Sequence, residues 1–187
     1  MNISQEGLAL IKKFEGCELK SYRCSAEVLT IGYGHKGVEE GQEITQEEAE
    51  EMLSSELDEY EGYINDMVEC ELEQHQFDAL VAWVYNLGPS NLKSSTLLKR
   101  LNSNELKDVP NQLKRWNKAG GKILQGLVRR RKSESLLFEG KDWRDVCSIR
   151  GSKTVFDPVR FCLWMKSMLL SIFLRYFEKD VLLSEKF

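Results

Sequence analysis

The apolar positions along the chain predict one short helix, then a small sheet, then mostly helices. Large apolar side chains recur at helical spacing between about residues 4 and 14, and Gly16 is a natural helix stop. From about residue 19 to 44 the pattern changes to short strand-like runs, such as Leu29-Thr30-Ile31, separated by glycine turns. This order predicts an α+β fold that is mainly helical, with a small β-hairpin or sheet near the N-terminus.

Helical periodicity dominates after residue 44. Thr45 and Glu48 have the spacing of a capping box, and they open a long amphipathic helix suited to connecting two lobes. A second apolar stripe starts near Phe77 and ends at Gly88-Pro89. Further helices are expected at about residues 95–101, 109–116 and 126–138.

The composition is that of an ordinary globular domain. The chain has 187 residues, of which 42% are hydrophobic and 30% charged, so we expect one domain with a sizeable core and room for an appendage. Its five cysteines form no CxxC pair and no framework spacing, which is typical of a reducing compartment. The two histidines, His35 and His75, lie far apart, so we expect no metal site.

Charge is distributed unevenly, although the net charge is only −4. Residues 37–92 contain sixteen acidic residues and no lysine or arginine, whereas residues 93–160 contain seventeen basic and seven acidic residues. A basic half favours encounter with an anionic polymer such as a bacterial wall. The acidic middle and the lack of a recognised binding motif argue against nucleic acid. The run Arg129-Arg130-Arg131-Lys132 is more typical of a solvated helix face than of a site.

Three candidate catalytic residues lie close together near the N-terminus. Glu15, Cys24 and Thr30 are separated by eight and five intervening residues, and Thr30 runs into Ile31-Gly32-Tyr33-Gly34-His35. Hydrolysis of a glycosidic bond requires a proton donor for the leaving oxygen and a second group on the opposite face of the sugar. Glu15 suits the donor role, because an apolar neighbourhood and the negative end of a helix dipole both favour a protonated carboxyl.

This spacing resembles the catalytic signature of the phage-type lysozymes, glycoside hydrolase family 24, which includes the T4- and lambdoid-type endolysins. Further blocks resemble the helical half of the lambdoid members and follow in the same order, so the resemblance covers about residues 3–143. These blocks are Gln76-Phe77-Asp78-Ala79-Leu80, Val84-Tyr85-Asn86-Leu87-Gly88, Ser95-Thr96-Leu97-Leu98, Arg115-Trp116-Asn117-Lys118-Ala119-Gly120-Gly121 and Leu124-Gln125-Gly126-Leu127-Val128-Arg129-Arg130-Arg131.

The resemblance implies a two-lobed, lysozyme-like catalytic domain over residues 1–145. A small β-containing lobe is expected at about residues 15–45, and a helical lobe at about residues 65–145. The implied activity is that of an endolysin-type muramidase, which hydrolyses the β-1,4 bond between N-acetylmuramic acid and N-acetylglucosamine in peptidoglycan. No cofactor is needed for this chemistry.

The resemblance also assigns roles to single residues. Glu15 would be the general acid, while Cys24 and Thr30 would activate, hold or support the attacking group on the other side. The residues expected to line the sugar cleft are Tyr33, His35, Tyr85 and Thr96, and His35 is alternatively a residue that holds the turn.

Cys24 departs from the commonest family pattern, in which an aspartate occupies this position. A free thiol has a pKa of about 8.5, so it is mostly protonated at pH 7, unlike an aspartate. It acts either as a thiolate base or nucleophile, or merely orients water. Some family members carry cysteine here, so we interpret Cys24 as functional. Whether the anomeric carbon is inverted or retained stays open.

No apolar run that would serve as an export signal follows Met1. We therefore expect a monomeric protein that stays in the cytoplasm of the infected host cell and depends on a membrane-permeabilising partner, a holin, to reach the wall.

The last part of the chain, residues 146–187, resembles nothing that we can place. Residues 161–177 are strongly apolar, but Lys166 and Arg175 interrupt them, so the charge-free run is too short for a membrane span. Three interpretations stay open: a helix packed on the domain, a helix that contacts a membrane surface or a partner, and a poorly ordered extension.

Two other function classes compete with the muramidase. One is a cysteine-dependent wall peptidase or amidase with Cys24 as nucleophile and His35 as base, although a turn before a strand is not the usual place to activate a thiol. The other is a wall-binding protein that has kept the fold and lost activity. The reaction products discriminate between the three.

Overall fold

The first helix, α1 (Gln5–Glu15), begins and ends where its flanking residues dictate. The hydroxyl of Ser4 accepts a hydrogen bond from the backbone N–H of Glu6 at 3.2 Å, as an N-cap does. Gly16 follows the helix with a φ of 72°, a backbone conformation that favours glycine. The computed structural model describes residues 1–24, 27–144 and 146.

A three-stranded antiparallel sheet follows α1. Its strands β1 (Glu18–Arg23), β2 (Leu29–Gly32) and β3 (His35–Lys36) lie in the order β1-β2-β3. Thr30 on the central strand pairs with Tyr22 on one side and Lys36 on the other. The small sheet expected near the N-terminus is confirmed.

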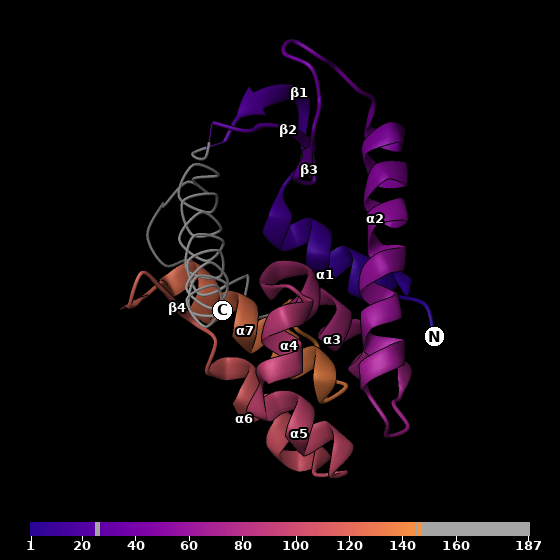
Figure 1. Ribbon diagram of the computed structural model, residues 1–187, viewed down its shortest axis with the longest axis vertical. Helices are drawn as coiled ribbons and strands as arrows, with labels where there is room; N and C mark the ends of the chain where they lie inside the picture. The colour runs from indigo at the N-terminus through magenta and orange to yellow at the C-terminus, as the bar shows by residue number, and fades with distance from the viewer. Residues whose placement is uncertain (25–26, 145, 147–187) are drawn as a thin grey trace, which may run out of the picture.

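The long helix α2 (Gln46–Met67) connects the sheet to the rest of the molecule. The capping box that the sequence predicts is present, because the side chain of Thr45 accepts from the N–H of Glu48 while the carboxylate of Glu48 accepts from the N–H of Thr45. Figure 1 shows α2 running along one side of the molecule, from near the level of the sheet past α1 into the helical part. The structure is therefore two-lobed, as the resemblance implies.

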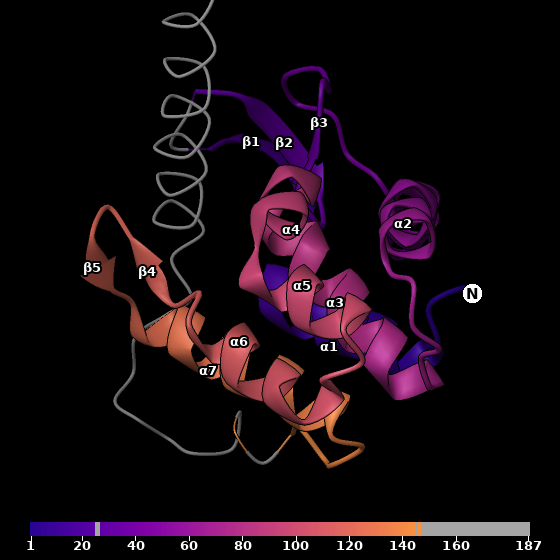
Figure 2. The same cartoon turned by 60° about the horizontal axis from the view of Figure 1, so that its bottom comes forward.

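The helical lobe is built around α3 (Gln74–Leu87), which is buried over most of its length. Trp83 on this helix is fully buried and meets Trp116 edge to face, with 5.2 Å between the ring centroids. The elements that follow α3 in the chain can be traced in Figure 2. They are α4 (Pro89–Ser94), α5 (Thr96–Asn102), the 3₁₀ turn η1 (Leu106–Asp108), α6 (Val109–Lys114), the hairpin of β4 (Lys118–Ala119) and β5 (Lys122–Ile123), and α7 (Gln125–Phe138).

The fold class is confirmed as α+β and mainly helical. Helix α4, the turn η1 and the β4–β5 hairpin are not predicted from the sequence. Gly88-Pro89 was interpreted as the end of a helix, but Pro89 also begins α4, because proline is well suited to the first helical position. The short β4–β5 hairpin has only two residues in each strand, too few to give an alternating pattern.

The division at residue 145 stays a prediction. Apart from Val146, the extension predicted at residues 146–187 and its apolar segment 161–177 lie outside the described residues. Within the described ranges, no helix is both long and apolar enough to cross a membrane.

Candidate active site

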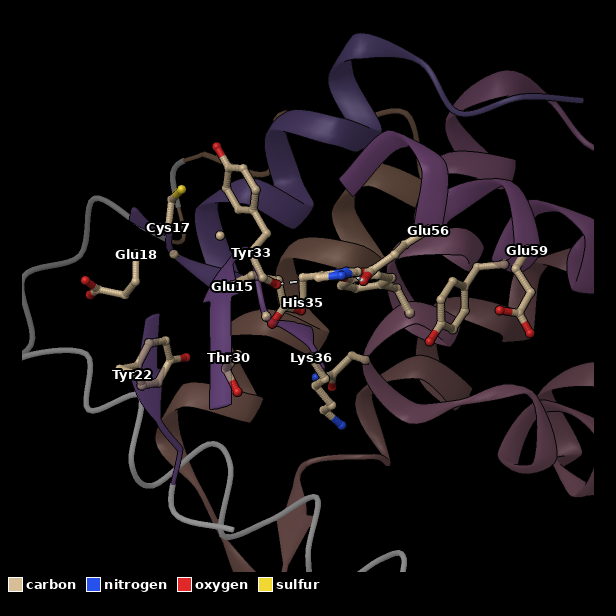
Figure 3. Close-up of a pocket in the computed structure, with 16 residues that line it drawn as sticks. Glu15, Cys17, Glu18, Tyr22, Thr30, Tyr33, His35, Lys36, Glu56 and Glu59 are labelled. Carbon is tan, nitrogen blue, oxygen red and sulfur yellow. Dashed lines mark hydrogen bonds and ion pairs between the residues drawn. The ribbon is translucent and has the colours of Figure 1, made fainter. Parts of the chain in front are cut away.

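A cavity of about 350 Å³ opens between the sheet and the helices α1, α2 and α3. Figure 3 shows side chains from the sheet and from the helices pointing into it. Its lining residues are Glu15, Gly16, Cys17, Glu18, Tyr22, Thr30, Gly32, Tyr33, Gly34, His35, Lys36, Glu56, Glu59, Tyr60, Tyr85 and Asn86.

Glu15 lies on the wall of this cavity, at the C-terminal end of α1. Only 7% of its side chain is exposed. Its Oε1 accepts a hydrogen bond of 2.6 Å from Nη1 of Arg130, a residue of α7 that is 115 positions away in the sequence. The Arg130 guanidinium also lies over the ring of Phe14, 5.8 Å from its centroid. The buried guanidinium of Arg130 therefore holds the carboxyl group of Glu15, the candidate proton donor, in place.

Arg130 is one of four charged residues that we call the buried ion cluster: Glu15, Arg130, Arg131 and Glu134. Oε1 of Glu134 accepts from Nε of Arg130 at 3.1 Å and from Nη2 of Arg131 at 2.7 Å. Desolvation opposes the charge of Arg130, but the carboxylates of Glu15 and Glu134 outweigh it and raise the pKa of Arg130. For Arg131 desolvation wins, and burial lowers its pKa to about 10.

Thr30 and Cys24 meet at one backbone carbonyl on the sheet side. The carbonyl oxygen of Val28 accepts from the hydroxyl of Thr30 at 3.1 Å and from the backbone N–H of Cys24 at 3.0 Å. Thr30 lines the cavity, whereas Cys24 is only 2% exposed and is not among the lining residues. The two predicted residues are thus neighbours, but only one of them faces the cavity.

His35 and Tyr85 are joined through Glu56 of α2. Nδ1 of His35 lies 2.5 Å from Oε1 of Glu56, and the hydroxyl of Tyr85 donates to Oε2 of the same residue at 3.1 Å. Figure 3 shows the His35 ring beside the Glu56 carboxylate. Burial, together with the nearby Glu15 and Glu56, raises the pKa of Tyr85. Glu56 therefore ties the sheet, the connecting helix and α3 together at the cavity.

Five of the seven predicted site residues line the same cavity, and two do not. Those that do are Glu15, Thr30, Tyr33, His35 and Tyr85. Thr96 is exposed at the start of α5, where the neighbouring Ser95 caps the helix, and it lies outside the lining. Its role in substrate binding, like the catalytic role of Cys24, stays a prediction.

Sequence reasoning missed two parts of this site. Glu56 went unnoticed because it is one of many acids on α2. The interpretation of residues 129–132 as a solvated face is wrong for Arg130 and Arg131, which are 2% and 0% exposed. Their spacing held a signal, because Leu127, Arg130, Arg131 and Glu134 fall on one face of a helix. In the described part of the chain, no group of histidine, cysteine and acidic residues is arranged to hold a metal ion.

The model of the family described as phage lysozyme matches residues 12–134 of this chain. The endolysin of Salmonella phage P22 is 37% identical over 144 residues, which cover 74% of this chain and 98% of that endolysin. The endolysin of Bacillus phage B103 is 44% identical over 142 residues, which cover 74% of this chain and 54% of that endolysin. The chain belongs to the phage lysozyme family.

Solved structures agree with this assignment. A mutant of P22 lysozyme has a TM-score of 0.69 at 35% identity, covering 74% of this chain and 99% of that one. The muramidase domain of SpmX from Asticaccaulis excentricus has a TM-score of 0.69 at 34% identity, covering 73% and 97%. The chain spans about half the length of the two Bacillus phage endolysins that it matches.

Proposed function

We propose that this protein is an endolysin-type muramidase, which hydrolyses the β-1,4 bond between N-acetylmuramic acid and N-acetylglucosamine in bacterial peptidoglycan and thereby lyses the host cell. The observation that carries the proposal is the position of Glu15, at the end of α1, on the wall of a cavity that Thr30 lines from the sheet. Membership of the phage lysozyme family supports it.

In the proposed reaction Glu15 gives its proton to the glycosidic oxygen as the bond to the anomeric carbon breaks. The carboxylate that forms stays hydrogen-bonded to Arg130, which stabilises the new negative charge. Thr30 holds the attacking water. Cys24, whose backbone N–H shares the carbonyl of Val28 with the Thr30 hydroxyl, assists from the same side either as a thiolate base or by orienting the water. Water supplies the hydroxyl of the new reducing end. Its remaining proton is released to the solvent, from which Glu15 regains a proton for the next cycle.

The sugar would contact the side chains that line the cavity near Glu15. Tyr33 and Tyr85 offer apolar ring surface, and His35 is held by Glu56. Thr96 is included only by the family resemblance, and we propose it as an outlying contact for a longer glycan.

Product chemistry on purified peptidoglycan tests the reaction class. A muramidase releases new reducing ends that carry N-acetylmuramic acid, whereas a peptidase or amidase releases new amino groups. The appearance of amino groups without reducing ends would contradict the proposal, and the absence of both would leave a wall-binding protein.

The cysteine peptidase is the weaker candidate on geometric grounds. Its proposed base, His35, lines the cavity, but its nucleophile, Cys24, is buried outside the lining. A thiolate nucleophile has to reach its substrate and the base that activates it.

We also propose that the protein accumulates in the cytoplasm as a monomer, that a holin releases it, and that residues 1–145 suffice for activity. The cytoplasmic location and the holin are what the resemblance to the lambdoid endolysins implies. Expression in bacteria with and without a permeabilising agent tests release, since lysis should require the agent. Light scattering gives the molar mass in solution and so tests whether the protein is a monomer. A protein truncated after Asp145 should release reducing ends at the rate of the full chain.

A further inference from the structure

One buried carboxylate beside the cavity has no part in the proposed reaction. Glu134 of α7 is fully buried, does not line the cavity, and is held by both Arg130 and Arg131. Arg130 uses its Nη1 for Glu15 at 2.6 Å and its Nε for Glu134 at 3.1 Å. The two carboxylates therefore share a single guanidinium.

This sharing matters because a general acid must hold a proton before it can donate one. A buried arginine in direct contact with Glu15 favours the carboxylate form and so opposes that proton. Burial raises the pKa of Glu134, while Arg131 and Arg130 favour its charged form. As a carboxylate held by both arginines, Glu134 acts in the other direction, since its negative charge offsets part of the positive charge that Glu15 meets. With Glu15 protonated, the buried ion cluster carries one net positive charge; without Glu134 it would carry two.

Glu134 also fixes the direction of the arginine. Its Oε1 holds the Nε edge of Arg130, and the carbonyl of Ala82 accepts from Nη2 at 3.3 Å. Only Nη1 is then directed at Glu15. A guanidinium held on three sides presents one constant hydrogen bond to the acid rather than a variable one.

We propose that Glu134 is a positioning residue for the muramidase reaction, which acts through Arg130 to let Glu15 keep its proton at the pH where the enzyme works. This inference rests on the proposed function of Glu15. It assigns a role to a residue that touches neither the cavity nor the sugar.

Other groups also contribute to the electrostatic environment of Glu15, and the single substitutions of Glu134 leave them unchanged. Tyr60 of α2 and Tyr85 of α3 both interact electrostatically with Glu15, and Arg131 of α7 adds positive charge behind Arg130. The other ionisable side chains that line the cavity are Cys17, Glu18, Tyr22, Tyr33, His35, Lys36, Glu56 and Glu59.

The central experiment is the pH dependence of kcat/KM for Glu134→Gln, measured as release of reducing ends from peptidoglycan. The amide keeps the shape and an oxygen acceptor but removes the charge. The alkaline limb of the profile, where Glu15 loses its proton, should move down by at least about one pH unit. Above that limb the rate should fall about tenfold. A folded Glu134→Gln protein with an unmoved limb would overturn the proposal.

Two further variants separate charge from shape. Glu134→Asp keeps the charge, so its alkaline limb should stay near that of the wild type; a limb that moves as far as in Glu134→Gln contradicts the proposal. The double variant Glu134→Gln/Arg131→Gln restores the charge balance, so its limb should return toward the wild-type position. If Glu134 has only a structural role, all three variants should have lower thermal stability, and the alkaline limb should not follow the charge of the cluster.

Carboxyl carbon NMR of the wild-type protein gives a test that needs no variant to fold. Glu134 should remain ionised over the pH range in which Glu15 titrates, and a protonated Glu134 in that range would overturn the proposal. If the wild type releases no reducing ends, the proposed function fails, while this titration still decides whether Glu134 is ionised when Glu15 titrates.

Discussion

The two ends of α1 each carry a glutamate that is held by an arginine from the C-terminal part of the described chain. At the start of the helix, Arg144 donates to Glu6 at 2.5 and 3.0 Å, and the two side chains are 51% and 44% exposed. At the end of the helix, Arg130 donates to Glu15 at 2.6 Å, and the exposed fractions are 2% and 7%. The pairs are chemically alike and differ mainly in burial.

That difference decides what each pair can do. Water and salt screen the exposed pair, so its contribution to folding is small. The buried pair is barely screened, and removing one partner leaves a charge without compensation. Burial thus turns an ordinary ion pair into one that affects the free energy of unfolding.

Removing the buried cation should have the largest effect on stability. Arg130→Met leaves Glu15 and Glu134 buried without their shared partner, so the free energy of unfolding should fall by about 3–5 kcal/mol. Urea denaturation measures this change. Arg129→Met is the matched control, since Arg129 is the exposed neighbour in the same helix and should change stability by less than about 0.5 kcal/mol. Equal losses in the two variants would contradict the distinction by burial.

A substitution on the sheet side of the cavity should lower the enzymatic rate more than it lowers the stability of the fold. If Cys24 assists the attacking water, Cys24→Ala should lower the rate of reducing-end release about 100-fold, the low end of the range for positioned acid–base groups. Cys24→Asp should stay active, because it restores the residue commonest in the family. Cys70→Ala is the control, since Cys70 is half-buried and lies in the connection between α2 and α3 rather than beside the sheet. A fully active Cys24→Ala protein would reduce Cys24 to a packing role.

The exposed pair should give the smallest effect, and one that depends on pH. The hydrogen bond from Arg144 lowers the pKa of Glu6 below its ordinary value of 4.5. The pair therefore contributes stability above that value and loses the contribution as the pH falls through the lowered pKa. Glu6→Gln should be slightly less stable than the wild type at pH 7, with the difference vanishing in acid. Thermal melts at both pH values measure it, and a difference that persists in acid would show that the charge is not its source.

How much of this could be predicted from the sequence depended on the distance between the interacting residues. Local signals worked: Gly16 ended α1, Thr45 and Glu48 opened α2, and the spacing from Glu15 to Thr30 indicated residues that line one cavity. These features are set by hydrogen bonds and backbone conformations within a few residues, which the sequence displays directly.

The contacts that complete the site join distant parts of the chain and were missed. The pairing of Glu15 with Arg130 spans 115 residues, and Glu56 meets His35 and Tyr85 from a different helix. A charged residue is exposed by default, so nothing in composition marked Arg130 as buried. The one local sign of its burial is its place on the same helix face as Leu127 and Glu134.

The most direct test of the account compares the two glutamates of α1. Reducing-end release from peptidoglycan should be measured for Glu15→Gln and Glu6→Gln at equal concentrations of folded protein. The account predicts a fall of at least about 100-fold for Glu15→Gln, since the amide has no proton to donate to the leaving oxygen, and a nearly unchanged rate for Glu6→Gln. A Glu15→Gln protein that keeps most of the wild-type rate would contradict the assignment of Glu15 as the general acid.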